Sequence, residues 1–164
     1  TQSESALRDA IRSAQVSADD AVHKKADQFF VNARTPSALL TFTSPDNSLT
    51  IRLTTERIDL ELVLTLWQQE LSQPLFATTD PLAYAKSAEA RLAKVSTFLA
   101  DASVALSRAL SVAPMTEATL EGYQSDISSA RAAISDSIAT LTSAKTVLVG
   151  ARGTLALAVA GATP

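Results

Sequence analysis

A repeat near the C-terminus, over residues 116–159, places a large apolar residue at every seventh position. The members of this seam are Leu120, Ile127, Ile134, Leu141, Leu148 and Leu155. Three positions after each comes a mostly small residue, namely Tyr123, Ala130, Ser137, Ala144, Ala151 and Ala158. Such a repeat is typical of a long helix that lies close against partner helices. No proline interrupts it before Pro164, so the pattern predicts one helix of roughly 60 Å.

Three further segments carry apolar residues at helical spacing. The first segment has its apolar face at Leu7, Ile11, Ala14, Ala18, Val22, Ala26 and Phe29. The second keeps helical phase through Leu49, Leu53, Leu60, Leu64, Trp67 and Leu71. The third repeats the large-and-small seam with Leu92, Leu99 and Leu106 beside Ala88, Val95, Ala102 and Ala109. Together with the C-terminal repeat, these patterns predict helices over about 3–32, 48–72, 80–112 and 116–159.

Residues 38–53 are open to two interpretations. Apolar residues alternate on both sides of 44–47, which is a hairpin pattern. However, Leu49 and Leu53 already share the phase of the helix that follows, and capping residues precede them. The sequence leaves a β-hairpin open but favours an ordered loop and a helix that starts near Ser48.

The link between the third and fourth predicted helices, residues 112–116, is short. Two long helices joined by so few residues must pack as an antiparallel hairpin. We therefore expect an all-α fold, an antiparallel up-down-up-down four-helix bundle with a long coiled-coil-like C-terminal hairpin. The length fits a single helical domain over 1–164. Since the chain has no initiating methionine and no signal-type leader, we expect it to be a fragment of a larger protein.

Composition narrows the classes of function. A net charge of −3, with Lys and Arg scattered singly, argues against a nucleic-acid-binding protein. The chain has no cysteine, which excludes disulfides and thiolate metal sites. It has no uninterrupted apolar run of about 18 residues, so we expect no membrane span within it.

The only histidine, His23, has Asp19, Asp20 and Asp27 within helical reach. Asp19 and Asp27, at four-residue offsets, could join it as metal ligands. One imidazole with two flexible carboxylates is a poor ligand set for a transition metal. We therefore favour a surface imidazole stabilised by neighbouring carboxylates over a metal site.

The sequence contains no residue pattern that favours catalysis. Asp59 and Glu61 point in different directions on a helix, and Glu56 with Asp59 is a like-charge pair typical of a solvated face. A serine nucleophile needs a positioned base, and the single histidine lies in the first predicted helix. The four glycines do not form a phosphate-binding loop. We expect a protein that is not an enzyme and binds no cofactor.

Most of the aromatic surface comes from Phe29, Phe30, Phe42, Trp67 and Phe76. We expect a helical hairpin to bring these rings together at the ends of the first two helices. We favour a plug that packs the loop onto the bundle, with a small apolar ligand pocket as the alternative.

The last helix is rich in Ala and Ser and ends in the sequence Leu155-Ala156-Leu157-Ala158-Val159-Ala160-Gly161-Ala162-Thr163-Pro164. This ending resembles the Ala-Gly-x-x-Pro-like step that closes the α-helical hairpin of bacterial periplasmic adaptors, the HlyD-like membrane fusion proteins. The turn 115–121 is similar to the Ile-Ser-x-x-x-(aromatic/aliphatic)-Asp stretch that starts the returning helix of that family. The likeness covers about residues 80–164. The first two helices look like an added hairpin that thickens the rod.

The resemblance implies a non-catalytic helical spacer and docking domain of an efflux or secretion system. Its expected partners are copies of itself, an inner-membrane transporter and, at the tip, an outer channel. The implied localisation is extracytoplasmic, in the periplasm or at the cell surface. Attachment to the inner membrane would come from parts outside this sequence.

In that family an Arg, a Leu four residues later and a Ser seven further meet the outer channel. Arg108, Val112 and Thr119 keep this spacing here, whereas an alignment on Thr116 places Ala105 at the Arg position. The resemblance therefore implies a partner-docking tip whose candidate residues are Arg108, Val112, Pro114, Met115, Thr116 and Thr119.

Two other functions remain open from the sequence. One is an extracytoplasmic four-helix sensor domain of the chemoreceptor kind, which would have membrane spans outside both ends and a ligand. The other is a purely structural bundle without a ligand.

Overall fold

The computed structural model describes residues 1–112 and 115–161. It is 82% helix, which confirms an all-α chain. In chain order its elements are α1 (Gln2–Asp19), the π-helix η1 (Asp20–Ala26), the 3-10 helix η2 (Asp27–Phe29), β1 (Phe30–Val31), β2 (Leu39–Leu40), α2 (Asn47–Ser72), α3 (Pro74–Thr78), α4 (Pro81–Ser107) and α5 (Glu117–Gly161).

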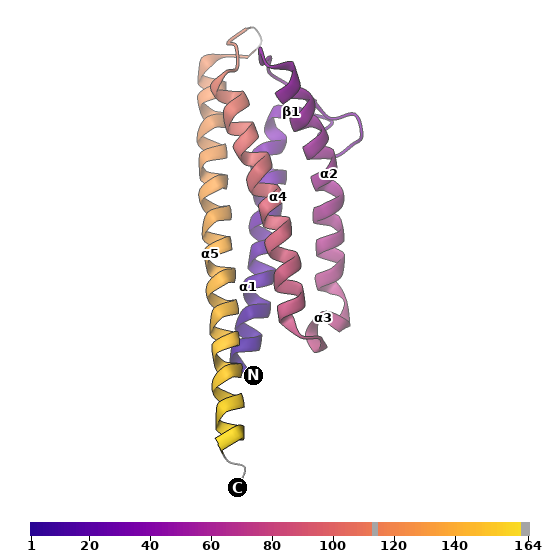
Figure 1. The fold of residues 1–164 in the computed structure, drawn as a ribbon. Coiled ribbons are helices and arrows are strands. Elements are labelled where there is room, and N and C mark those ends of the chain that lie inside the picture. Colours follow the sequence, from indigo (N-terminus) through magenta and orange to yellow (C-terminus); the bar gives the residue numbers. More distant parts are fainter. Residues whose placement is uncertain (113–114, 162–164) are drawn as a thin grey trace.

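The longest helix, α5, packs against α1 and α4, and these two also contact each other. The helix α2 packs against α4 and α1. Figure 1 shows α5 returning the chain to the end of the molecule where α1 begins. The three helices α1, α4 and α5 thus form the inner group, and α2 lies on its flank.

Small residues allow the inner group to pack closely. α1 buries Ala10, Ala14 and Ala18, α4 buries Ala85, Ala88 and Ala102, and α5 buries Ala130. Large seam residues such as Leu92, Ile127 and Leu141 fill the spaces between them and are also buried. Burying a Leu or Ile side chain contributes about 1.5–3 kcal/mol, so this seam supplies much of the driving force for folding.

The first helical stretch starts with a capping box and ends earlier than predicted. Thr1 accepts a hydrogen bond from the Glu4 amide, and the Glu4 side chain bonds back to the Thr1 amine. The stretch runs through η1 and η2 to Phe29, not to residue 32. At Phe30 the backbone turns extended and pairs with Leu40 in a two-residue antiparallel ladder.

The region that the sequence left open contains a loop and a helix start. α2 begins at Asn47, and the Asp46 carboxylate accepts a hydrogen bond from the Leu49 amide at 3.0 Å. A short ladder exists, but it joins Phe30–Val31 to Leu39–Leu40 and not the two sides of 44–47. The alternating pattern around 44–47 therefore belongs to a loop that leads into a capped helix.

The segments around α4 also differ from the predicted bounds. A separate short helix, α3, begins with Pro74 at its first position. α4 ends at Ser107, five residues before the predicted end at 112. The chain leaves the helix because the Leu110 amide donates to the Thr43 carbonyl at 3.0 Å, which joins this link to the loop before α2.

The C-terminal end of α5 extends beyond the other helices (Figure 1). Residues 153–161 are all exposed, including Leu155 at 63% and Leu157 at 76%. By length and composition α5 is the one helix among residues 1–112 and 115–161 that is apolar enough to cross a membrane. The expectation of no membrane span stays a prediction, because length and composition alone do not show that a helix crosses a membrane.

A glycine near the start of α5 offers a test of helix energetics. A Cβ added at Gly122 meets nothing within 4 Å. We expect Gly122→Ala to raise the free energy of unfolding by about 0.5–1 kcal/mol, because alanine loses less backbone entropy in a helix. Chemical denaturation measures this change. Gly153→Ala, in the projecting end of α5, is the matched control and should raise the free energy of global unfolding less. An equal increase in the two variants would show that the projecting end unfolds together with the rest of the protein.

Candidate functional site

The structure gathers the predicted docking tip at the link between α4 and α5. Arg108 is the C-cap of α4, and its Nη1 lies 3.5 Å from the Asp46 carboxylate. Val112 is 58% exposed, and its carbonyl accepts from the Met115 amide at 2.9 Å. Pro114 lies outside the described residues.

Two other tip residues form the N-terminal cap of α5. The Thr116 hydroxyl accepts from the Thr119 amide at 3.2 Å, and the two hydroxyls lie 2.8 Å apart. Both threonines therefore have a structural role at the start of α5. Val112 and neighbouring Leu110, which is 48% exposed, are the exposed large apolar residues among the described positions of this link.

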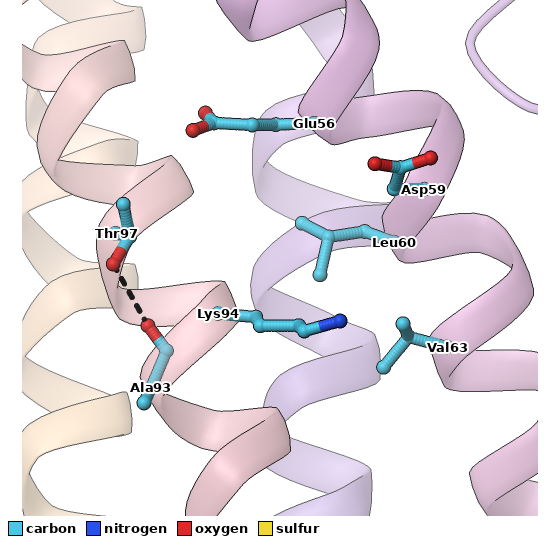
Figure 2. Close-up of a pocket in the computed structure, with 7 residues that line it drawn as sticks. All are labelled: Glu56, Asp59, Leu60, Val63, Ala93, Lys94 and Thr97. Atoms are coloured by element: carbon cyan, nitrogen blue, oxygen red, sulfur yellow. Dashed lines mark hydrogen bonds between the residues drawn. The ribbon is translucent and has the colours of Figure 1, made fainter.

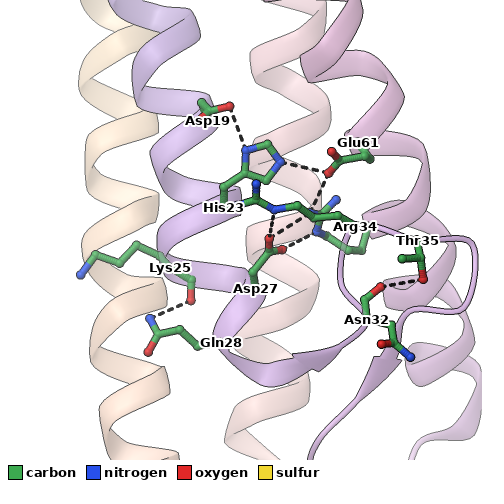
Figure 3. A network of polar contacts seen from close by, with 10 residues as sticks. Asp19, His23, Lys25, Asp27, Gln28, Asn32, Arg34, Thr35 and Glu61 are labelled. Atoms are coloured by element: carbon green, nitrogen blue, oxygen red, sulfur yellow. Dashed lines mark hydrogen bonds and ion pairs between the residues drawn. The ribbon is translucent and has the colours of Figure 1, made fainter.

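Charged side chains from the first helical stretch and the loop after β1 meet others from α2 around the fully buried Arg57 (Figure 3). We call this set the buried charge cluster. Its members are Asp19, His23, Asp27, Arg34, Arg57 and Glu61. Arg57 is completely buried and donates from Nε to Asp27 Oδ1 at 2.6 Å and from Nη2 to Glu61 Oε2 at 2.9 Å. Arg34 donates to the other oxygen of Asp27 at 3.1 Å. Oppositely charged partners thus compensate part of the desolvation of Arg57, whose buried Nη1 has no hydrogen-bond partner among the described residues.

His23 lies between two carboxylates of this cluster. Its Nδ1 is 2.8 Å from Asp19 Oδ1, and its Nε2 is 3.0 Å from Glu61 Oε2. Only 13% of the side chain is exposed, so it is not the surface imidazole that the sequence predicted. Asp27 bonds to arginines instead, and the described part of the chain contains no group of three or more residues suited to hold a metal ion.

The charges of this cluster stabilise one another. Burial favours the neutral form of Glu61, but hydrogen bonds from Arg57 and His23 outweigh it and lower the pKa of the carboxyl. Burial likewise disfavours the charged Arg57, yet Asp27 and Glu61 raise its pKa. The cluster is a structural connection between the first helical stretch and α2, and the π-helix η1 carries His23 to it.

Sequence reasoning missed Arg57, although a signal was available. Arg57 stands between Leu53 and Leu60 on the face of α2 that points into the core. A charged residue in such a register must find an opposite charge when it is buried. The acidic residues near His23 were the available partners.

The predicted aromatic cluster divides into two. Phe29 contacts Phe30, Phe42 and Tyr123, with ring centroids 5.2–5.9 Å apart. Phe76 instead packs edge-on against Tyr84, and the Trp67 ring lies under Arg91. The prediction of one cluster was wrong because α2 carries Trp67 away from the loop where Phe42 lies. Both groups are packed side chains.

A groove of about 360 Å³ lies between α2 and α4 (Figure 2). It is lined by Glu56, Asp59, Leu60, Val63, Ala93, Lys94 and Thr97. Asp59 and Glu61, which the sequence paired, therefore have different surroundings, since Glu61 belongs to the buried charge cluster. The groove exists because α2 lies on the flank of the close-packed inner group.

Arg152 lies on α5 directly before the exposed residues 153–161. It donates to Glu4 at 2.8 Å and to both oxygens of Asp80 at 2.9 and 3.0 Å. Hydrogen bonds from Arg152 and from the N-terminal amine lower the pKa of Glu4 to about 2, and a hydrogen bond from Arg152 also lowers the pKa of Asp80. Arg152 thereby ties α5 to the starts of α1 and α4.

We expect Arg57→Met to lower the free energy of unfolding by about 3 kcal/mol, because it removes the cation that neutralises Asp27 and Glu61. Urea denaturation measures the loss. Arg52→Met is the matched control on α2: the Arg52 side chain, which pairs with Asp101, is half exposed, so a much smaller loss is expected. Equal losses in both variants would refute a special role for Arg57.

Acid denaturation should reveal the Arg152 contacts. A carboxyl whose pKa is lowered by folding stabilises the protein above its ordinary pKa, 4.5 for Glu4, and loses this effect as the pH falls towards about 2. We therefore expect Arg152→Met to be less stable than the wild type at neutral pH, with a difference that shrinks between about pH 5 and 2. Arg131→Met, whose side chain bonds to the Ser103 hydroxyl, should differ from the wild type by a constant amount.

Comparison with known proteins leaves the function to be argued from this geometry. No family model, no curated protein and no solved structure matches the chain.

Proposed function

We propose that the four long helices form an up-down-up-down bundle that serves as a non-catalytic helical spacer and docking domain. In this proposal the domain belongs to a membrane-fusion (periplasmic adaptor) subunit of an efflux or secretion system. Its site is extracytoplasmic, and its partners are further copies, an inner-membrane transporter and, at the 108–119 link, an outer channel.

The observation that carries the proposal is the abrupt exposure of the α5 seam. Leu148 is 1% exposed, whereas Leu155, the next member of the seven-residue repeat, is 63% exposed. The repeat thus continues past Arg152 with the same residue types after the other helices have ended. An apolar seam that continues beyond its own partners supports packing against further helices.

The rest of the molecule suits a mechanical role. α4 and α5 pack together along the α4 seam, as a helical hairpin of an adaptor would. The His23 nitrogens face carboxylates, which favours a structural role over that of a catalytic base. The link at 108–112 is held by Asp46 and Thr43, so the α5 end offers more uncovered apolar surface than the predicted tip.

A test is to place charge on the projecting seam. We expect the wild type to self-associate in sedimentation equilibrium, and the double variant Leu155→Asp, Leu157→Asp to weaken association at least about tenfold, because two apolar contacts are lost. Ser128→Asp with Ser135→Asp adds the same charge to the exposed body of α5 and should leave association unchanged.

Two results would contradict this assignment. One is a wild type that stays monomeric at every concentration, alone and joined to the rest of its natural chain. The other is flotation with lipid vesicles that the same double variant abolishes, because the segment would then contact lipid and not protein.

A sensor domain is the second candidate, favoured by the groove between α2 and α4. A ligand in that groove would contact both helices and bias how they pack. Apolar spans immediately outside both ends of this chain, together with a ligand that raises the melting temperature, would favour the sensor over the spacer.

A further inference from the structure

The outward face of α5 carries a second repeat near its C-terminal end. Its members follow at alternating intervals of four and three residues, and all are exposed: Ser143, Val147, Gly150, Thr154, Leu157 and Gly161. We call this set the outer seam. It lies on the opposite side of the helix from the buried residues Leu141 and Leu148, because 3.6 residues make one turn. This spacing on an exposed helix face is the pattern by which one helix packs against another.

Gly150 is a member of the outer seam that the chain's own fold does not explain. It lies inside α5, where glycine costs roughly 1 kcal/mol relative to alanine. A Cβ added at Gly150 meets nothing within 4 Å, so no other part of the described structure requires a glycine at this position. A glycine on a helix face allows another backbone to approach closely. Its place near the middle of the outer seam therefore indicates where a partner helix crosses.

The outer seam can be covered without burying an unpaired charge. None of its six members is charged. Lys145 pairs with Glu89 on α4, and Arg152 pairs with carboxylates at the starts of α1 and α4. The Thr154 hydroxyl donates to the Gly150 carbonyl at 3.1 Å, so it needs no acceptor outside α5. A second helix with an equally uncharged face can therefore lie against this one.

The outer seam is complementary to itself when two copies of α5 run antiparallel about the level of Arg152. Val147 then lies opposite Leu157 of the second copy, and both of these side chains are largely exposed in the single chain. Gly150 lies opposite Thr154 of the second copy, so a missing side chain faces a branched one. A two-fold axis makes the two halves of this contact identical and closes the assembly at two copies.

The surface that faces the end of the second copy is hollow. In the antiparallel pair, Gly161 of the second copy lies opposite Ser143. Ser143 lines a groove of about 570 Å³ between α1 and α5, together with small residues such as Ala6 and Ala144. The last turn of the second α5 thus has a groove to occupy. In a parallel pair the two projecting ends would lie beside each other, and this groove would stay open.

We propose that α5 pairs antiparallel with α5 of a second copy of this chain through the outer seam, with a two-fold axis near Arg152. The backbones approach closely at Gly150 and Thr154, and Val147 and Leu157 pack on both sides of that crossing. This contact also covers the part of α5 that extends beyond the other helices of its own chain (Figure 1). The pairing rests on the proposed function, since it specifies the partner and the contact face of a domain that self-associates.

Distances between the two copies test the direction of the pair. The chain has no cysteine, so a spin label can be attached at a single introduced one. In an antiparallel pair, a residue and its copy are separated along the axis by twice the offset from Arg152 at 1.5 Å per residue. This separation is about 40 Å for Ala139→Cys and about 60 Å for Ala132→Cys. We expect double electron–electron resonance of the labelled 164-residue chain to give both distances.

A leucine at the crossing tests the contact face. We expect Gly150→Leu to weaken self-association at least about tenfold in sedimentation equilibrium, because the added side chain separates the two backbones. Gly122→Leu is the matched control: a Cβ added there also meets nothing within 4 Å, but the residue lies near the start of α5 and should leave association unchanged. Leucine favours a helix more than glycine does, and circular dichroism shows that both variants are folded.

The outcomes separate this pairing from the proposed function. A wild type that stays monomeric overturns both. A wild type that self-associates but gives the same short distance at positions 132 and 139 forms a parallel pair, which overturns the antiparallel pairing alone. Unchanged association in Gly150→Leu also overturns the pairing and leaves the spacer function in place.

Discussion

The close approach of α5 to α1 and α4 is the interaction on which the rest of this structure depends. It requires small residues where helices touch, such as Ala14 and Ala88, and large ones such as Leu141 between them. Dispersion and burial along this seam offset the backbone entropy of a very long helix. Everything less tightly packed, including α2, the loops and the end of α5, is arranged around this inner group.

The connection of α2 to that group relies more on charge. Arg57 is completely buried, and Asp27 and Glu61 hold it there. A buried ion pair is a weak source of stability, but it specifies one register, because any slip of α2 would separate the charges. The same flank position leaves a groove between α2 and α4.

Particular residues show how far the sequence could be interpreted. The inward positions of the first stretch, from Leu7 to Phe29, are buried, because a 3.6-residue period exposes or covers a whole face at once. The Thr116 cap was also predictable, since it depends on neighbours in the chain. The end of α4 was not, because Leu110 leaves the helix to bond Thr43, far away in sequence. Nor was the division of the aromatic residues, which depends on where α2 carries Trp67.

The sequence by itself determined the helical class and which face of each helix is apolar, because both follow from local periodicity. Only the tertiary structure decided that Arg57 is buried among acids, that His23 lies between two carboxylates and that Leu155 is uncovered where Leu148 is not. These facts depend on where other helices begin and end in space. The seven-residue repeat of α5 carries no information about the length of the helices beside it. The repeat alone therefore could not show which of its residues lie beyond the ends of those helices.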